Sequence, residues 1–284
     1  MTYDPNALQN ALLTLLTQEY GKLNAPLPTN QKIEEEVDKA LANNIFNALK
    51  EQRQHIVDEV LRRINTSIGS ASVLADDGNH VPWLKEQDRK SWRLWPRLAN
   101  YLAETKPDEW TPRIMHELDD STEKTLDKLE SPLREGQWDR RGLVVGHVQS
   151  GKTAHYTALA AKAIDAGYQI VIILAGIHNS LRSQTQERID EELIGRDSTN
   201  NNQAILSGVG EFDKRKGAPP LPFIIWTCTT SEENGDFRPA IATQVFVPVG
   251  EGTRLVMVVK KNASILRQLT GWLRSLTPQP GQGR

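Results

Sequence analysis

One stretch decides the fold class of this chain, and it reads Gly142-Leu143-Val144-Val145-Gly146-His147-Val148-Gln149-Ser150-Gly151-Lys152-Thr153. Its second part matches the pattern of a glycine, any four residues, then Gly-Lys and Ser or Thr. A chance match in a chain of this length is expected at about one in a hundred. The apolar residues 142–145 predict a short strand that leads into the loop, and residues 152–166 predict the helix that leaves it.

A loop of this type between a strand and a helix is suited to hold phosphate groups. Its backbone N–H groups converge, and the helix N-terminus adds partial positive charge. Lys152 would reach the β and γ phosphates, while the Thr153 hydroxyl would occupy one position on an octahedral Mg²⁺ ion. The sequence therefore predicts ATP and Mg²⁺ as cofactors. The expected nucleotide-binding residues are Gly146, Gln149, Ser150, Gly151, Lys152 and Thr153, with Thr153 as the metal ligand. The alternative is a glycine turn with an exposed lysine.

The chain after this loop alternates between strand and helix patterns. Apolar, β-branched runs at 168–175, 223–227 and 254–259 predict strands, and residues 179–193 and 264–276 predict helices. Such alternation favours a parallel sheet with crossover helices. The expected fold class is α/β, a P-loop RecA-like domain over residues 131–276.

The N-terminal part, residues 1–130, is expected to be mainly helical. Leucines recur at helical spacing after Asp4, and residues 31–64 predict either one long helix or a broken pair. Three closely spaced tryptophans, Trp83, Trp92 and Trp95, lie among basic residues. They could stack bases, but burial in a core is the favoured interpretation because tryptophan supplies large apolar area. Residues 277–284 predict a disordered tail.

Phosphoryl transfer needs an acidic residue that holds the metal at the end of a buried strand. No predicted strand after Lys152 ends in Asp or Glu, and Asp213, Glu232 and Glu233 are interpreted as loop residues. The sequence thus predicts nucleotide binding with weak or no hydrolysis.

Net charge, cysteine content and the length of the apolar runs limit the classes of protein to which this chain can belong. The 284 residues carry 34 basic and 36 acidic side chains, so the bulk charge of −2 gives no global attraction to nucleic acid or anionic lipid, and any contact with a polyanion must come from a local patch. The single cysteine, Cys228, lies in an apolar run and is expected to be a buried thiol. No apolar run approaches the length of a membrane span, and no metal-ligand spacing of His and Cys is present. We expect a soluble, cytoplasmic protein with no membrane partner.

Two blocks carry a resemblance to a known family. These are Trp138 to Thr153 and Ile177 to Arg188, supported upstream by residues 80–84 and 92–102. They resemble the Z-one domain family, whose members are described as candidate endonucleases and are similar to helicase ATPases. The resemblance implies ATP-driven action on DNA, in a restriction or defence system with partner subunits. Family members continue into a strand that ends in Asp-Asp-Glu-Ala-Asp, and this sequence stops before it, which predicts a truncated member.

The segment after the second predicted strand is the candidate nucleic-acid contact. In helicase-like ATPases this segment meets the sugar-phosphate backbone, and Arg and amide side chains suit phosphate. The residues are Asn179, Arg182, Gln184, Gln186 and Arg188. A solvated helix explains the same residues equally well. Gln137, upstream of the loop, is a possible adenine contact.

Three functions stay open at this point. The first is a helicase-type NTPase domain that acts on DNA. The second is a non-catalytic nucleotide-binding interaction module, which the missing acid favours. The third is a small-molecule kinase, which should carry an acid on a neighbouring strand and an arginine-rich lid, neither of which is found.

Overall fold

The computed structural model describes residues 4–20, 26–43, 45–65, 80–84, 89–145, 152–199, 205–245 and 252–276. The chain divides into two compact units, residues 1–162 and 163–284. The sequence places its boundary at residue 130, whereas this division falls within the helix α6 (Lys152–Asp165). The first unit thus includes the start of the helix that follows the glycine-rich loop.

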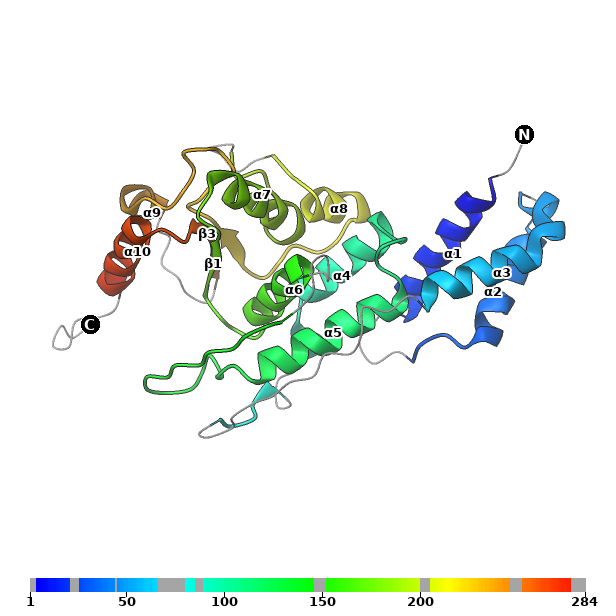
Figure 1. Cartoon of the computed structure of the whole chain (residues 1–284), viewed down its shortest axis with the longest axis horizontal. Helices are drawn as coiled ribbons and strands as arrows, with labels where there is room; N and C mark the ends of the chain where they lie inside the picture. The colour runs from blue at the N-terminus through cyan, green and yellow to red at the C-terminus, as the bar shows by residue number, and fades with distance from the viewer. Residues whose placement is uncertain are drawn as a thin grey trace. The chain divides into compact units, whose positions relative to one another are not determined.

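Three helices open the first unit: α1 (Pro5–Tyr20), α2 (Asn30–Ala42) and α3 (Arg53–Ile64), with a short 3₁₀ helix, η1 (Asn47–Gln52), before α3 (Figure 1). Residues 31–64 therefore form the broken pair rather than one long helix. The side chain of Thr29 caps α2 by accepting a hydrogen bond from Lys32 N at 3.2 Å. The helix ends at Asn43, whose backbone is extended.

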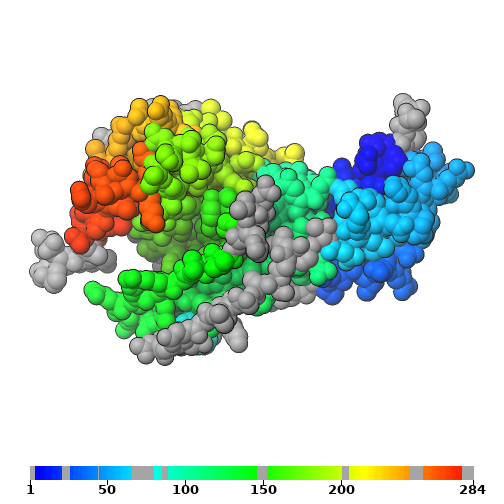
Figure 2. All heavy atoms as spheres, in the orientation of Figure 1, coloured from blue at the N-terminus to red at the C-terminus, as the bar shows by residue number. Residues whose placement is uncertain are grey.

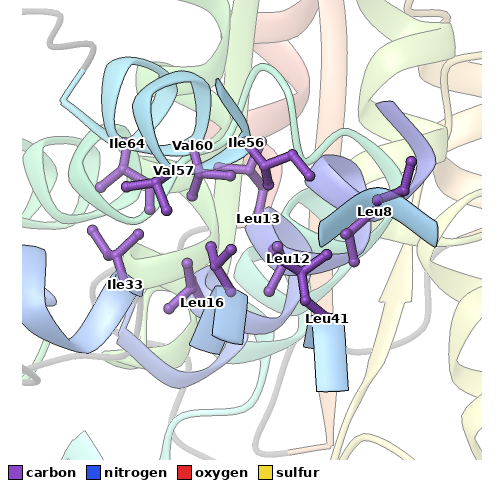
Figure 3. Packing of buried hydrophobic residues seen from close by; sticks show 12 residues of the cluster. Leu8, Leu12, Leu13, Leu16, Ile33, Leu41, Ile56, Val57, Val60 and Ile64 are labelled. Carbon is purple, nitrogen blue, oxygen red and sulfur yellow. The ribbon is translucent and has the colours of Figure 1, made fainter. Parts of the chain in front are cut away.

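An aliphatic cluster holds these helices together. Figure 3 shows its side chains pointing toward one another from α1, α2 and α3, and Figure 2 shows the helices, in blue, closely packed. The buried members are Leu8, Leu12, Leu13, Leu16, Ile33, Val37, Leu41, Leu49, Ile56, Val57, Val60 and Ile64. Charged pairs such as Arg53 with Asp38 lie at the surface, where they contribute little to stability.

The first unit continues through η3 (Arg89–Ser91), α4 (Leu94–Thr105) and α5 (Pro112–Asp127). Trp83, Trp92 and Trp95 are all buried, as the core interpretation predicts. The Trp83 indole donates a hydrogen bond to Leu129 O at 2.8 Å. Their faces are therefore not presented as an open platform for stacking bases.

The predicted strand over Gly142–Val145 is wrong. These residues have no regular secondary structure, and the side chains of Leu143 and Val145 are 87% and 85% exposed. A short apolar run forms a strand only where a neighbouring strand supplies hydrogen-bond partners. No pairing of residues 142–145 with β1, β2 or β3 occurs among the described residues.

The second unit contains a small parallel sheet. Its strands are β1 (Ile170–Ala175), β2 (Ile224–Trp226) and β3 (Thr253–Lys260), in the order β1-β3-β2. Ile170 pairs with Leu255, and Ile224 pairs with Thr253. The central strand β3 is buried along most of its length, as parallel strands between helices usually are, whereas β1 is half-buried and its Leu174 is 47% exposed. The chain is thus of the α/β class.

Helices pack on both faces of the central strand β3. One face of β3 packs Leu255, Met257 and Val259 against α9 (Pro239–Val245) and α10 (Ala263–Leu276). The opposite face carries Val256 and Val258, and α7 (Asn179–Ile189) packs on that side. In Figure 1, α9 and α10 lie together on one side of β1 and β3, with α7 on the other.

The strands and helices predicted after the loop all form, with shifted ends. Two further helices were not predicted: α8 (Val209–Lys216), which follows the π-helix η4 (Asp190–Ile194), and the short α9. Cys228 is buried, and burial raises the pKa of its thiol to about 12. None of the helices within the described ranges has the length and apolar character that crossing a bilayer requires.

Candidate functional site

The helix α6 carries the two described residues of the glycine-rich loop motif. It begins at Lys152, so the motif ends where the helix starts. Lys152 is exposed and Thr153 is half-buried. Gly146, Gln149, Ser150 and Gly151 lie outside the described residues, and their roles stay predictions. Gln137 lies in an exposed segment without regular structure.

A buried ion pair fixes α6 within the first unit. Lys162 has no exposed surface, and its Nζ donates to Asp119 O, 2.6 Å away, and to the Asp119 carboxylate. The same Nζ lies 4.7 Å from the centre of the Trp95 ring. Burial lowers the pKa of Lys162, an effect that Asp119 opposes. Removing either partner would leave an uncompensated buried charge, so this pair strongly determines where α6 packs.

The residues that lead toward the loop are joined to the end of α5. Glu130 is buried and forms ion pairs with Arg134, at 2.5 Å, and with Arg140. Burial raises the pKa of Glu130, but the hydrogen bonds from Arg134 and Arg140 outweigh it, and the pKa is lowered overall. Through Arg134 and Arg140, the Glu130 carboxylate therefore fixes the chain before and after Gln137.

The α7 helix carries all five predicted nucleic-acid contacts, but they do not share one face. Arg182 and Gln186 have no exposed surface, whereas Gln184 is exposed and Arg188 is half-buried. Asn179 accepts a hydrogen bond from Lys260 Nζ at 2.6 Å. The expected single surface of amide and guanidinium groups is thus split between the interior and the solvent.

Arg182 holds a loop of its own unit. Its guanidinium donates to the carbonyl oxygens of Thr230, at 2.5 Å, Gly235, at 3.3 Å, and Glu232. Burial lowers its pKa, an effect that nearby Asp236 opposes. Because its Nη donors are used by carbonyl groups inside the protein, Arg182 has a structural role in this conformation rather than a phosphate-binding one.

The backbone at Gly235 lies so close to Thr230 that no side chain fits at this position. A Cβ atom added there would lie 2.0 Å from Thr230 Oγ1 and 2.5 Å from Thr230 O. The hydrogen bond from Thr230 N to Gly235 O, 2.8 Å long, closes the loop. Gly235 and the buried Arg182 together therefore determine the backbone conformation of residues 230–235.

Gln186 continues the polar network one turn along α7. It donates from Nε2 to Asp190 Oδ1 at 2.8 Å and accepts from Thr229 Oγ1 at 2.8 Å. Thr229 Oγ1 in turn accepts from the backbone N–H of Val258 in β3, and Asp190 Oδ2 accepts from Ser198 N. Burial raises the pKa of Asp190 to about 6, although hydrogen bonds from Ser198 and Gln186 act to lower it. Gln186 thus ties α7 to the end of β2 and to β3.

The carboxyl ends of the strands form the edge where α/β proteins usually bind ligands. Here β1 is followed by Gly176, β2 by Thr227, and β3 ends at Lys260, so the described strands end without an acid. Sequence reasoning missed one carboxylate near this edge. Asp236 Oδ1 accepts from Lys260 N at 3.3 Å, and its Oδ2 lies 3.6 Å from Lys260 Nζ.

This carboxylate is already neutralised by a lysine, and no pattern in the sequence pairs it with Lys260. Arg238, two positions after Asp236, and Lys261, next to Lys260, are exposed. Within the described ranges, no group of three or more His, Cys, Asp or Glu side chains is placed to hold a metal ion.

Comparisons with protein-family models, with curated proteins and with solved structures find no match to this chain. The class that the structure defines is an α/β unit with a three-stranded parallel sheet, together with a helical unit that includes Lys152 at the start of α6.

Proposed function

We propose that this chain is the ATP-binding, RecA-like P-loop domain of a helicase-like protein that acts on DNA, of the Z-one type. The observation that carries the proposal is that α6 starts at Lys152, directly after the glycine-rich loop. The positive N-terminal end of this 14-residue helix supports the proposal, because in motifs of this kind the phosphates bind next to it. Lys152 and the Thr153 hydroxyl would then serve the triphosphate and its Mg²⁺ ion.

The rigidity of α6 supports this role. A phosphate site depends on donors that keep their positions when the ligand arrives. The buried Lys162–Asp119 pair and the Trp95 ring hold the far end of the helix. The first turn of α6 is thus carried by an anchored element.

We expect this chain alone to hydrolyse ATP weakly or not at all. The described strands end in Ala175, Trp226 and Lys260, and Asp236 is paired with Lys260. A carboxylate that already pairs with a lysine is a poor ligand for Mg²⁺, because the cation would have to displace the ammonium group.

The DNA-facing residues of the proposal differ from those of the sequence prediction. Arg182 and Gln186 are internal, so the candidate surface consists of exposed Gln184 and Lys261, together with the half-buried residues Asn179 and Arg188. These groups suit a phosphate backbone but carry no base specificity. DNA as substrate, cytoplasmic location and partner subunits in a restriction or defence system remain part of the proposal.

A second candidate is a non-catalytic module in which bound nucleotide only orders the domain. The absence of acidic residues at the ends of β1, β2 and β3 favours this module, because nucleotide binding needs only the loop, whereas hydrolysis also needs an acid that holds the metal. Measuring ATP turnover with and without DNA separates the two. Stimulation by DNA supports the motor, and tight binding without turnover supports the module.

The proposal is tested by titrating a fluorescent ATP analogue in Mg²⁺ buffer into the wild-type protein and Lys152→Ala. We expect the variant to bind about tenfold to a hundredfold more weakly, because a charge-assisted contact to phosphate is lost. Lys50→Ala is the matched control, since Lys50 is an exposed lysine of the helical region. Equal affinity of wild type and Lys152→Ala, or no binding at millimolar nucleotide, would overturn the proposal.

A further inference from the structure

A proline-rich segment, residues 216–222, leads from the last residue of α8 toward β2 in the second unit. It reads Lys-Gly-Ala-Pro-Pro-Leu-Pro, a basic residue followed by two prolines with the spacing Pro-x-x-Pro. Residues 218–221 have no regular secondary structure, and Pro219, Pro220 and Pro222 are exposed. One proline after a helix is enough to stop it, so three within four positions are more than the end of α8 requires.

The covalent structure of this segment favours the polyproline II conformation. The proline ring fixes φ near −65°, and a residue that precedes proline is disfavoured in the α region. At least one of these restrictions applies to every position from Ala218 to Pro222. A polyproline II helix has three residues per turn, so Pro219 and Pro222 share one edge of it and Pro220 lies on another.

Both ends of the segment are anchored within its own unit. After α8, Gly217 is left-handed with a φ of 62°, and Ala218 N donates to Asp213 O at 3.0 Å. At the other end the chain bends at residues 222–223, and Ile224 N donates to Gly252 O at 3.0 Å. The segment therefore has little conformational freedom to lose, which lowers the entropic cost of binding a partner.

Positive charge is concentrated directly before the prolines. Lys214, Arg215 and Lys216 are exposed, and residues 214–222 contain no acidic side chain. The charged groups of Arg215 and Lys216 lie 5.3 Å and 5.6 Å from the centre of the Phe212 ring. Cations followed by Pro-x-x-Pro are complementary to a groove that is lined by aromatic rings and has acidic residues at one end.

We propose that residues 216–222 bind a partner protein through a groove of the SH3 type, lined by aromatic side chains and acidic at one end. Such a groove accommodates residue–proline pairs one turn apart, which Ala218-Pro219 and Leu221-Pro222 supply. Lys216, three positions before Pro219, would meet the acidic residues. The segment is separate in sequence from the glycine-rich loop, and the proposal does not depend on the proposed function.

The test titrates an SH3 domain that prefers a basic residue before Pro-x-x-Pro into the ¹⁵N-labelled full chain, followed by NMR. We expect saturable binding, with the largest amide shifts at Lys216, Ala218 and Leu221. Pro219→Ala and Pro222→Ala should each weaken binding about tenfold, because each removes two methylene groups from the contact. Lys216→Glu should weaken it by about tenfold as well, because like charges then face each other.

Pro220→Ala is the matched control. Pro220 lies on the edge turned away from the groove, so its replacement should change the affinity by less than about twofold. Circular dichroism checks that each variant is folded. No saturable binding of the SH3 domain to the wild type at millimolar concentration, shifts that spare residues 216–222, or equal losses in Pro219→Ala and Pro220→Ala would overturn the proposal.

Discussion

The interior between the N-terminal helices is apolar, whereas the interior beneath α7 is polar. Between α1, α2 and α3 the buried side chains are aliphatic, and the ion pairs lie outside. Under α7 the buried side chains include Arg182 and Gln186, whose donors and acceptors pair with the loop after β2. The first interior is held by area removed from water, and the second by matched hydrogen bonds. A helix can therefore bury one of its faces even when that face carries polar side chains.

The aliphatic interior should show the largest response to a single substitution. Leu13 is fully buried, whereas Leu15 on the same helix is 46% exposed. We expect Leu13→Ala to lower the free energy of unfolding by about 2–5 kcal/mol, because it removes buried methyl groups and leaves a cavity. Leu15→Ala should change it by less than about 1 kcal/mol. Urea unfolding followed by far-UV circular dichroism measures both, and similar losses would contradict the packing of α1.

The polar interior should respond nearly as strongly at Arg182. Arg182→Met leaves carbonyl groups of residues 230, 232 and 235 without their donor, and we expect a loss of about 2–3 kcal/mol. Hydrogen exchange of residues 227–237 should rise in this variant. The control is Gln184→Met, at an exposed position of α7, with a change below about 0.5 kcal/mol. A variant that lost DNA affinity but kept its stability would instead support the phosphate-contact prediction for Arg182.

The smallest effect concerns the buried carboxyl of Asp190. Its pKa is raised by burial from 3.8 to about 6, so the folded protein binds a proton more readily than the unfolded chain. The resulting stabilisation is fully present below about pH 4 and is lost as pH rises through about 6. Between pH 5 and pH 7 it should fall by about 1 kcal/mol.

Asp190→Asn removes this titration. Thermal unfolding of both proteins from pH 5 to pH 7 checks the effect, since other titrating groups contribute equally to each curve. We expect the stability of the wild type to decline relative to that of the variant as pH rises. Parallel curves would show that Asp190 titrates alike in the folded and unfolded chains.

Hydrophobic periodicity was enough to predict the helices that pack by their apolar faces. The spacing of Leu8, Leu12, Leu15 and Leu16 predicts the buried stripe of α1, and of these only Leu15, 46% exposed, lies outside it. The apolar runs of β1 and β3 mark the sheet. The pattern left open whether residues 31–64 form one long helix or a broken pair, and the structure has the pair, since α2 ends at Ala42 and α3 begins at Arg53. These features depend on residues close together in the chain, and such patterns can be followed directly in a sequence.

The sequence could not predict which face of α7 is buried. An arginine and two glutamines on a polar helix favour solvent or a phosphate backbone, because burial without partners is unfavourable. The partners of Arg182 are carbonyl groups some fifty positions away, and those of Gln186 include Thr229. The same reason applies to residues 142–145, since a strand needs a neighbour that local composition does not supply.

By itself, then, the sequence determined the helices with an apolar stripe and the α/β class, because each is a property of neighbouring residues. Only the tertiary structure decided that Arg182 and Gln186 face inward and that Asp236 pairs with Lys260. Each of these depends on which distant groups satisfy a polar atom once water is removed. Hydrogen-bond partners of that kind are set by the path of the whole chain.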